Sequence, residues 1–116
     1  MAAEADTALR VERVRHASGS VLHARLFGRT RLNVVGSACL EAAAAEWRAA
    51  TNDDDLRCVV LSGPHDAAFI GGADLKELGS LTSATAERFI RSIHGLCAAI
   101  RDCAGPVIAR RVESTR

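Results

Sequence analysis

The stretch Val59–Leu78, VVLSGPHDAAFIGGADLKEL, constrains the fold of this chain more than any other part of the sequence. It reads as an apolar strand, a polar loop, a Gly-Gly turn and the start of a helix. This order predicts that the backbone N–H groups of Gly72, Ala73 and Asp74 lie at a helix N-terminus, unpaired and facing outward. A helix start carries a partial positive charge, so it suits an oxygen that gains negative charge. We therefore expect a turn that binds such an oxygen.

Length and charge limit the other possibilities. A chain of 116 residues, 48% hydrophobic and 25% charged, is expected to fold as one domain. The net charge of +1 argues against nucleic-acid binding through phosphate contacts. No apolar run approaches the roughly 18 residues of a membrane span, and Met1–Leu9 does not resemble a signal peptide. We expect a cytoplasmic protein with neither nucleic acid nor membrane as its partner.

Metal binding is considered for two groups of residues. The chain has four cysteines without CxxC spacing, and we expect them to be buried, reduced thiols: Cys39, Cys58, Cys97 and Cys103. A zinc site that joins His94 to the last two is the alternative, although its spacing fits no usual ligand pattern. The carboxylates of Asp53–Asp55 also resemble a metal site, but a solvated turn is the preferred interpretation. No metal is therefore expected.

The first half of the chain predicts a hairpin and a helix. Ala8–His16 and Val21–Phe27 are strand candidates on either side of a Ser-Gly-Ser turn. In the second strand the two-residue period gives one apolar face, formed by Leu22, Ala24 and Leu26. Gly36–Thr51 then predicts a helix, and its buried face is expected to hold Leu40, Ala43, Ala44 and Trp47.

The second half predicts a strand at Arg57–Ser62, buried on both faces, and a short helical turn at Asp74–Leu78 stopped by Gly79. A longer helix is expected from about Ser83 to Asp102. Apolar residues recur along it at intervals of three and four: Phe89, Ile90, Ile93, Leu96, Cys97 and Ile100. Val107–Ala109 begins another strand. Residues 1–7 are expected to form a loose tail, and residues 110–116 a divergent charged one.

Four segments in this order resemble the opening of the enoyl-CoA hydratase/isomerase (crotonase) family. They are Arg31-Leu32-Asn33, Asp53–Gly63 (DDDLRCVVLSG), Ala68–Leu78 (AFIGGADLKEL) and Gly105–Ala109 (GPVIA). The resemblance covers roughly residues 10–109. It implies an α/β, truncated crotonase-like fold of strand–strand–helix units with an N-terminal β-hairpin. Residues 1–116 would then form a single partial crotonase-like domain.

The same resemblance assigns site residues. In the family the thioester carbonyl of an acyl-CoA sits between two backbone N–H groups, and Ala73 would supply one of them. Substrate contacts would come from Gly71, Gly72, Ala73, Asp74, Leu75, Lys76 and Leu32. Arg29 and Arg31 could meet the phosphates of coenzyme A, which enters as part of the substrate, so no separate cofactor is expected.

The rest of the family's catalytic machinery is not found in this sequence. The second donor would follow the PVIA-like strand in a glycine-rich turn, but Ala109 is followed by Arg110-Arg111-Val112. No catalytic carboxylate is assigned: Asp74 is expected to cap its helix, Glu77 to face solvent or pair locally, and Glu113 to be a solvated tail residue.

The resemblance thus implies a protein of the enoyl-CoA hydratase/isomerase family that acts on acyl-CoA thioesters through an oxyanion hole. As a truncated chain it is expected to be inactive. The alternative from another class is a non-catalytic acyl-CoA-binding or protein-interaction module. A flavodoxin-like nucleotide binder is a poor third interpretation, because the sequence has neither a P-loop nor a GxGxxG fingerprint. Family members commonly form trimers and hexamers, through later elements that this sequence lacks.

Overall fold

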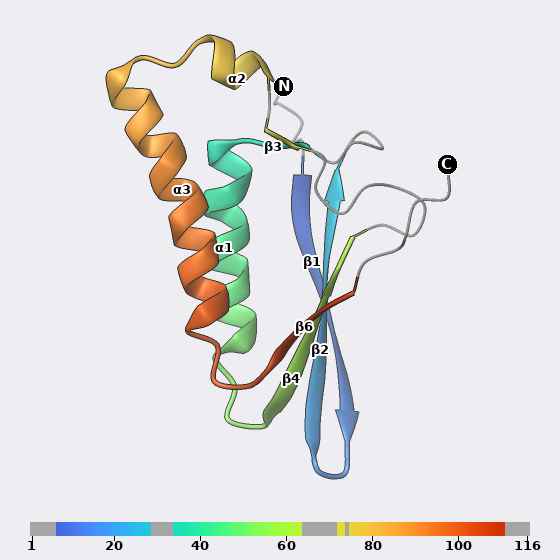
Figure 1. The fold of residues 1–116 in the computed structure, drawn as a ribbon. Helices are drawn as coiled ribbons and strands as arrows, with labels where there is room; N and C mark the ends of the chain where they lie inside the picture. The colour runs from blue at the N-terminus through green and yellow to red at the C-terminus, as the bar shows by residue number, and fades with distance from the viewer. Residues whose placement is uncertain (1–6, 29–33, 64–71, 74, 111–116) are drawn as a thin grey trace.

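The computed structural model describes residues 7–28, 34–63, 72–73 and 75–110. Figure 1 shows two helices side by side against one face of a twisted sheet. The strands are β1 (Thr7–His16), β2 (Gly19–Gly28), β3 (Val34–Val35), β4 (Leu56–Ser62), β5 (Gly72–Ala73) and β6 (Val107–Arg110), and the helices are α1 (Ser37–Thr51), α2 (Leu75–Gly79) and α3 (Ser83–Arg101).

Strands β1 and β2 form the expected antiparallel hairpin, paired from Thr7 opposite Gly28 to His16 opposite Gly19. Gly19 is required at the turn because its φ is +140°, a conformation that residues with a Cβ rarely adopt. A Cβ there would also lie 2.5 Å from Cγ of Arg57 and 2.7 Å from the carbonyl oxygen of Asp55. The hairpin predicted from the sequence is confirmed.

The main sheet has the order β1-β2-β4-β6, in which β2, β4 and β6 run parallel. Helix α1 connects β2 to β4, and α3 connects β4 to β6. Both helices therefore belong to crossover connections between parallel strands, which the expected strand–helix order requires. Gly105 precedes β6 at a close approach, since a Cβ there would lie 2.9 Å from the carbonyl oxygen of Arg57.

The core lies between the sheet and the helices. Leu22, Ala24 and Leu26 are all buried, as the two-residue period of the second strand predicts. Opposite them, α1 contributes Trp47, which is only 1% exposed. The other buried apolar members of this core are Leu9, Ala43, Leu56, Val59, Leu61 and Ala99, and Ala44 packs against them. The predicted inner face of α1 is confirmed.

Burial differs from the prediction in β4 and in α3. Strand β4 was expected to be buried on both faces, but Arg57 is exposed and Val60 is half-buried. The helices of the described chain cover one face of the sheet (Figure 1), so alternate residues of β4 remain accessible. In α3, Phe89 is buried as expected, whereas Ile90 is 49% exposed because it lies on the side of the helix away from α1.

The cysteines were also expected to be buried, and this is wrong. Cys97 is exposed on α3, and the other three, Cys39, Cys58 and Cys103, are half-buried. The apolar stripe along α3 is too wide for α1 and the sheet to cover completely. Its outer side, which includes Cys97, therefore stays accessible.

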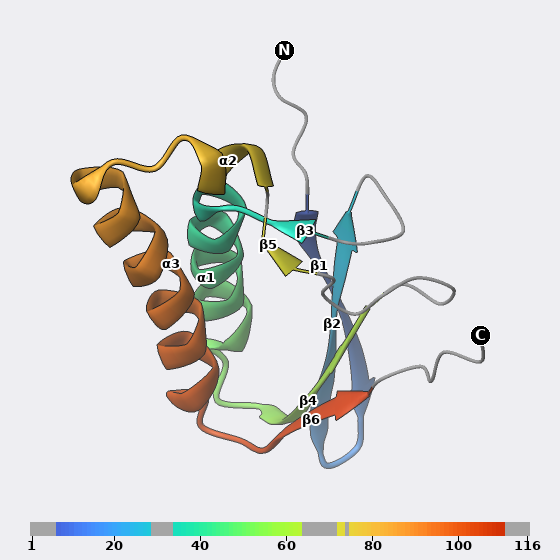
Figure 2. The ribbon, with the colours of Figure 1, turned by 45° about the horizontal axis from the view of Figure 1, so that its top comes forward.

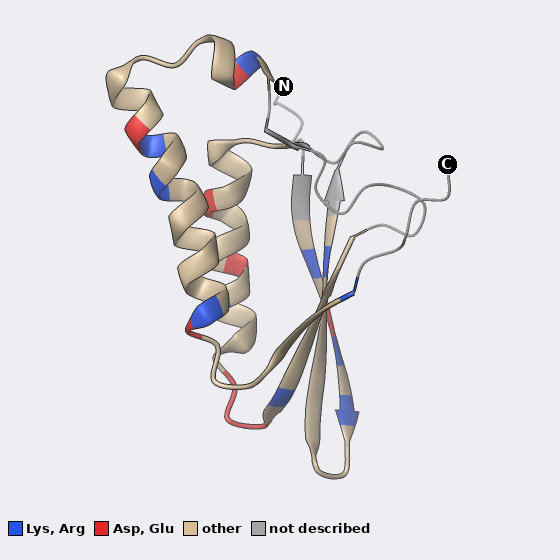
Figure 3. Cartoon of the chain, in the orientation of Figure 1, with Lys and Arg blue, Asp and Glu red and all other residues tan. Residues whose placement is uncertain are grey.

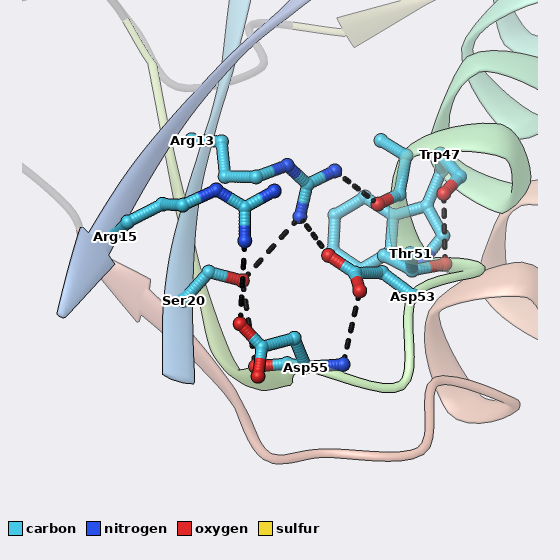
Figure 4. A network of polar contacts seen from close by, with 8 residues as sticks. Arg13, Arg15, Ser20, Trp47, Thr51, Asp53 and Asp55 are labelled. Carbon is cyan, nitrogen blue, oxygen red and sulfur yellow. Dashed lines mark hydrogen bonds and ion pairs between the residues drawn. The ribbon is translucent and has the colours of Figure 1, made fainter. Parts of the chain in front are cut away.

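The acidic turn before β4 joins the hairpin to the end of α1 (Figure 4). Arg13 donates to Oδ2 of Asp53 at 2.7 Å and to the carbonyl oxygen of Ala50 at 2.9 Å. Arg15 donates to Oδ2 of Asp55 at 3.3 Å, and the backbone N–H of Asp55 donates to Oδ1 of Asp53 at 2.9 Å. Two of the three adjacent carboxylates therefore hold the turn against β1.

Candidate functional site

The candidate site is the segment where β5 leads toward α2, and we call Gly72, Ala73 and residues 75–79 the β5–α2 corner. The sequence predicts a turn here, but Gly72 and Ala73 form a two-residue strand that runs parallel to β3. In its register Val34 is opposite Gly72 and Val35 is opposite Ala73. Figure 2 shows this small ladder beside the first turn of α1, and it is a sheet of its own with no strand of the main sheet in it.

The structure brings some of the expected site residues together and leaves others undescribed. Gly72 and Ala73 lie in β5, and Leu75 and Lys76 begin α2 directly afterwards. The remaining residues assigned by resemblance lie outside the described residues: Gly71, Asp74, Leu32, Arg29 and Arg31. Ala73 is thus at a junction from strand to helix, as the order of elements predicts.

The first residues of α2 present their side chains to solvent. Leu75 is 81% exposed, and Leu78, one turn later, is 40% exposed. Lys76 is exposed as well. Leu75 and Leu78 are therefore accessible apolar side chains, one turn apart on the same short helix. The corner therefore offers apolar and cationic side chains within a few residues of Ala73.

One contact of the corner was not expected from the sequence. Glu77 accepts a hydrogen bond from the backbone N–H of Ser37, at 2.8 Å from Oε1. Ser37 is buried and is the first residue of α1. The expectation that Glu77 faces solvent or pairs locally is therefore wrong, because its partner is forty positions earlier in the sequence. The only sequence signal was Gly36, an N-cap residue without a side chain to satisfy the helix start.

The charged residues around the corner include a surface ion pair between the two long helices. Arg88 of α3 donates from Nη2 to Oε1 of Glu41 on α1 at 2.7 Å, and from Nε to Oε2 at 2.9 Å. The hydrogen bond from Arg88 lowers the pKa of Glu41. The pKa of Arg88 is raised, first by its hydrogen bond to Glu41 and, as a smaller contribution, by the charge of Glu77. Glu77 thus lies close enough to influence this pair.

Charged residues of both signs are spread over the helices and strands (Figure 3). Within the described ranges, no three His, Cys, Asp or Glu residues group in a way that could hold a metal ion. Among the helices that the structure describes, none combines the length and apolar character needed to cross a bilayer.

Comparison with solved structures gives the same architecture. An enoyl-CoA hydratase from Bacillus anthracis superposes with a TM-score of 0.73 at 25% identity, over 87% of this chain and 38% of that one. An enoyl-CoA hydratase from Thermoplasma volcanium GSS1 has a TM-score of 0.64 at 27% identity, over 85% and 38%. An enoyl-CoA hydratase/carnithine racemase from Magnetospirillum magneticum, at 24% identity, shares the fold with a TM-score of 0.71, over 85% and 37%.

The chain therefore spans less than two-fifths of the length of these three relatives. A search of curated proteins gave no match. The fold is a partial crotonase fold that begins with an antiparallel hairpin, as the resemblance implied. The family model described as enoyl-CoA hydratase/isomerase matches residues 16–111, which is most of the sequence. The chain belongs to the enoyl-CoA hydratase/isomerase family.

Proposed function

We propose that this chain binds an acyl-CoA thioester and that the backbone N–H of Ala73 donates to the thioester carbonyl oxygen. The observation that carries the proposal is the position of Ala73, which ends β5 two residues before the first residue of α2 in a chain of this family. A backbone donor at such a junction suits an oxygen that becomes an enolate oxygen during reaction. One donor of this kind is typically worth about 3–4 kcal/mol in enzymes with oxyanion holes.

The neighbouring residues support the same ligand class. The accessible side chain of Leu75 offers an apolar surface to the acyl or pantetheine part of the ligand. Lys76, exposed on the same turn, offers a positive charge to a polar group of coenzyme A. An exposed ion contact contributes about 0–1 kcal/mol, so we expect weak binding, with a Kd on the order of 1 mM, equivalent to about −4 kcal/mol.

The test is a titration of the ¹⁵N-labelled chain with acetyl-CoA and, in parallel, with free coenzyme A. We expect amide shifts at Gly72–Lys76 with both ligands, and a larger shift of the Ala73 amide with the thioester. Leu75→Ser should weaken binding, whereas Ile90→Ser, an equally drastic change on the outer side of α3, should not. The absence of shifts, or shifts confined to residues far from the corner, would defeat the proposal.

We further propose that residues 1–116 alone do not turn over an acyl-CoA. The sequence offers one of the two donors that the family resemblance implies and no assigned catalytic carboxylate. General acid–base catalysis contributes about 10²–10⁴-fold, so losing it together with one donor leaves little activity. Hydration of crotonyl-CoA, followed by the loss of enoyl absorbance, measures this. Turnover that persists through further purification and disappears in Ala73→Pro would contradict it.

The alternative function is a non-catalytic interaction module. The exposed leucines of α2 and the exposed Ile90 of α3 favour it, because both are accessible apolar surfaces. The titration above separates the two functions: a module that contacts only proteins shows no shift at Ala73 with either ligand.

A further inference from the structure

We infer that Glu77 is a positioning residue for the backbone of Ala73, through its hydrogen bond to the first amide of α1. This inference rests on the proposed function, since the position of Ala73 matters for a ligand only if the thioester binds there. Glu77 itself is not placed against the ligand. Its carboxylate reaches back to Ser37, and so ties α2 to the start of the long helix.

The start of α1 needs a partner from elsewhere in the chain. Its N-cap is Gly36, which has no side chain to accept a hydrogen bond from the helix. The N–H and carbonyl groups of Gly36 interact with Sγ of Cys39, at 3.2 and 3.3 Å. The backbone N–H of Ser37 donates to the carboxylate of Glu77 instead. A carboxylate at this point also neutralises the positive end of the dipole of a 15-residue helix.

This contact matters for Ala73 because of the chain order around it. Strand β3 ends at Val35, two residues before Ser37, and β5 ends at Ala73, four residues before Glu77. The two segments therefore touch twice, once through the ladder of Val35 with Ala73 and once through Ser37 with Glu77. Two paired residues on each strand give little stability alone. The hydrogen bond from Ser37 to Glu77 adds a second connection between the same two segments, and we call the ladder and this hydrogen bond together the frame.

The geometry of Glu77 is consistent with a fixed carboxylate. Its side chain is half-buried, in contrast to the exposed Leu75, Lys76 and Leu78 around it. The amide that it accepts from is buried and 2.8 Å away, a length typical of a strong charge-assisted hydrogen bond. Its charge also acts on Arg88, which is held by Glu41. The hydrogen bond to Ser37 thereby links the corner to α1.

The experiment compares Glu77→Ala, Glu77→Gln and a matched control, Glu87→Ala, in the ¹⁵N-labelled full chain. Glu87 is an exposed glutamate that pairs with Arg91 within α3, so its loss removes the same charge without touching the corner. The first readout is hydrogen exchange of the backbone amides of Val35 and Gly72 in the β3–β5 ladder without ligand, because the N–H of Ala73 is the group proposed to face the ligand. The second is the affinity for acetyl-CoA.

In Glu77→Ala we expect exchange in the β3–β5 ladder to accelerate about tenfold, since a hydrogen bond to a charged group is worth at least that factor. Amides in the middle of α1 should keep their rates, which excludes general unfolding. Glu77→Gln retains an acceptor oxygen at the same reach and should recover most of the protection. If the wild type binds acetyl-CoA, Glu77→Ala should also bind it several-fold more weakly.

The outcomes separate the inference from the proposed function. Unchanged exchange at Val35 and Gly72 in Glu77→Ala, or an equal effect in Glu87→Ala, would overturn the positioning role, whether or not the ligand binds. If the wild-type chain does not bind acetyl-CoA but Glu77→Ala still exchanges faster in the ladder, the proposed function is refuted. The role of Glu77 in the frame is then still supported.

Discussion

Arg88 donates hydrogen bonds to both carboxylate oxygens of Glu41, from Nη2 to Oε1 at 2.7 Å and from Nε to Oε2 at 2.9 Å. This pair joins α3 to α1, and its residues are 47 positions apart in the sequence. Two parallel N–H donors in the plane of a carboxylate are the most favourable geometry for an ion pair. The pair lies on the surface, where solvent screens it, so we expect a modest contribution that depends on pH and salt.

The stability contributed by this pair should disappear in acid. Arg88 lowers the pKa of Glu41 below its ordinary value of 4.5. A carboxyl group whose pKa is lower in the folded state stabilises the fold above its unfolded pKa, and loses that effect as the pH falls through its folded pKa. We therefore expect wild type to melt slightly above Glu41→Gln at pH 7, and the difference to shrink as the pH falls below 4.5 and through the lowered pKa of Glu41. Thermal melts of both proteins across this range provide the measurement.

The control for this comparison is Glu46→Gln, which changes another exposed glutamate of α1. A melting difference between wild type and Glu41→Gln that grows as the pH falls would contradict the role of the Arg88 pair. High salt at pH 7 should shrink the difference in the same way as acid does.

Among the ion pairs of the described residues, the one made by Arg13 should contribute most to stability. Its guanidinium is only partly exposed, with 28% side-chain accessibility, and it serves both Asp53 and the carbonyl oxygen of Ala50. Arg13→Met keeps much of the aliphatic length but removes the donor to the carbonyl oxygen of Ala50 and to Oδ2 of Asp53. We expect the free energy of unfolding to fall by about 1–2 kcal/mol, after allowance for solvent screening.

Arg15→Met provides the matched test, because Arg15 makes a longer contact of 3.3 Å to Asp55 and its side chain is 67% exposed. We expect a loss of at most about 0.5 kcal/mol for it, as for most surface ion pairs. Denaturant titrations give both values, and equal losses in the two variants would contradict the ranking.

Much of this fold could be predicted from local patterns. The alternation of Leu22, Ala24 and Leu26 gave the inner face of β2, and the helical spacing of Leu40, Ala43 and Trp47 gave that of α1. These patterns predict burial correctly because each strand or helix buries its apolar face, whichever element packs against it. The outer side of α3 shows where such patterns fail. Phe89 and Ile90 both belong to the apolar stripe of this helix, but only Phe89 is buried, because burial depends on which neighbours are present.

The candidate site was less predictable. The glycines and the helix start are local features, so the strand-to-helix junction around Ala73 could be predicted. The ladder of Val35 with Ala73 and the contact of Glu77 with Ser37 could not, because each joins segments about forty positions apart. Two-residue strands carry no periodic signal, and nothing near Glu77 in the sequence indicates which amide its carboxylate will reach.

The hairpin turn offers a test of backbone strain. Gly19→Ala places a Cβ at a positive φ and against Arg57 and the carbonyl oxygen of Asp55. We expect a loss of about 1–3 kcal/mol in unfolding free energy, the usual cost of such strain. Gly95→Ala is the counterpart, because its Cβ would meet nothing within 4 Å and it lies inside α3. It should stabilise by about 1 kcal/mol. A loss in both variants, or in neither, would contradict this assignment.

The last prediction concerns association through β6. Within the described part of the chain, β6 ends the main sheet and pairs on one side only, with β4. Ile108, one of the two inner residues of this four-residue strand, is 54% exposed. An accessible apolar edge strand favours pairing with another chain, so we expect the apparent mass in size-exclusion chromatography with light scattering to rise with concentration. Ile108→Lys should restore a monomer, since a charge on an edge strand opposes pairing. Ile90→Lys is the matched control on α3, where no edge is available, and should change the mass less. A wild-type monomer at every concentration, or an equal effect of the two substitutions, would show that β6 is not the associating edge.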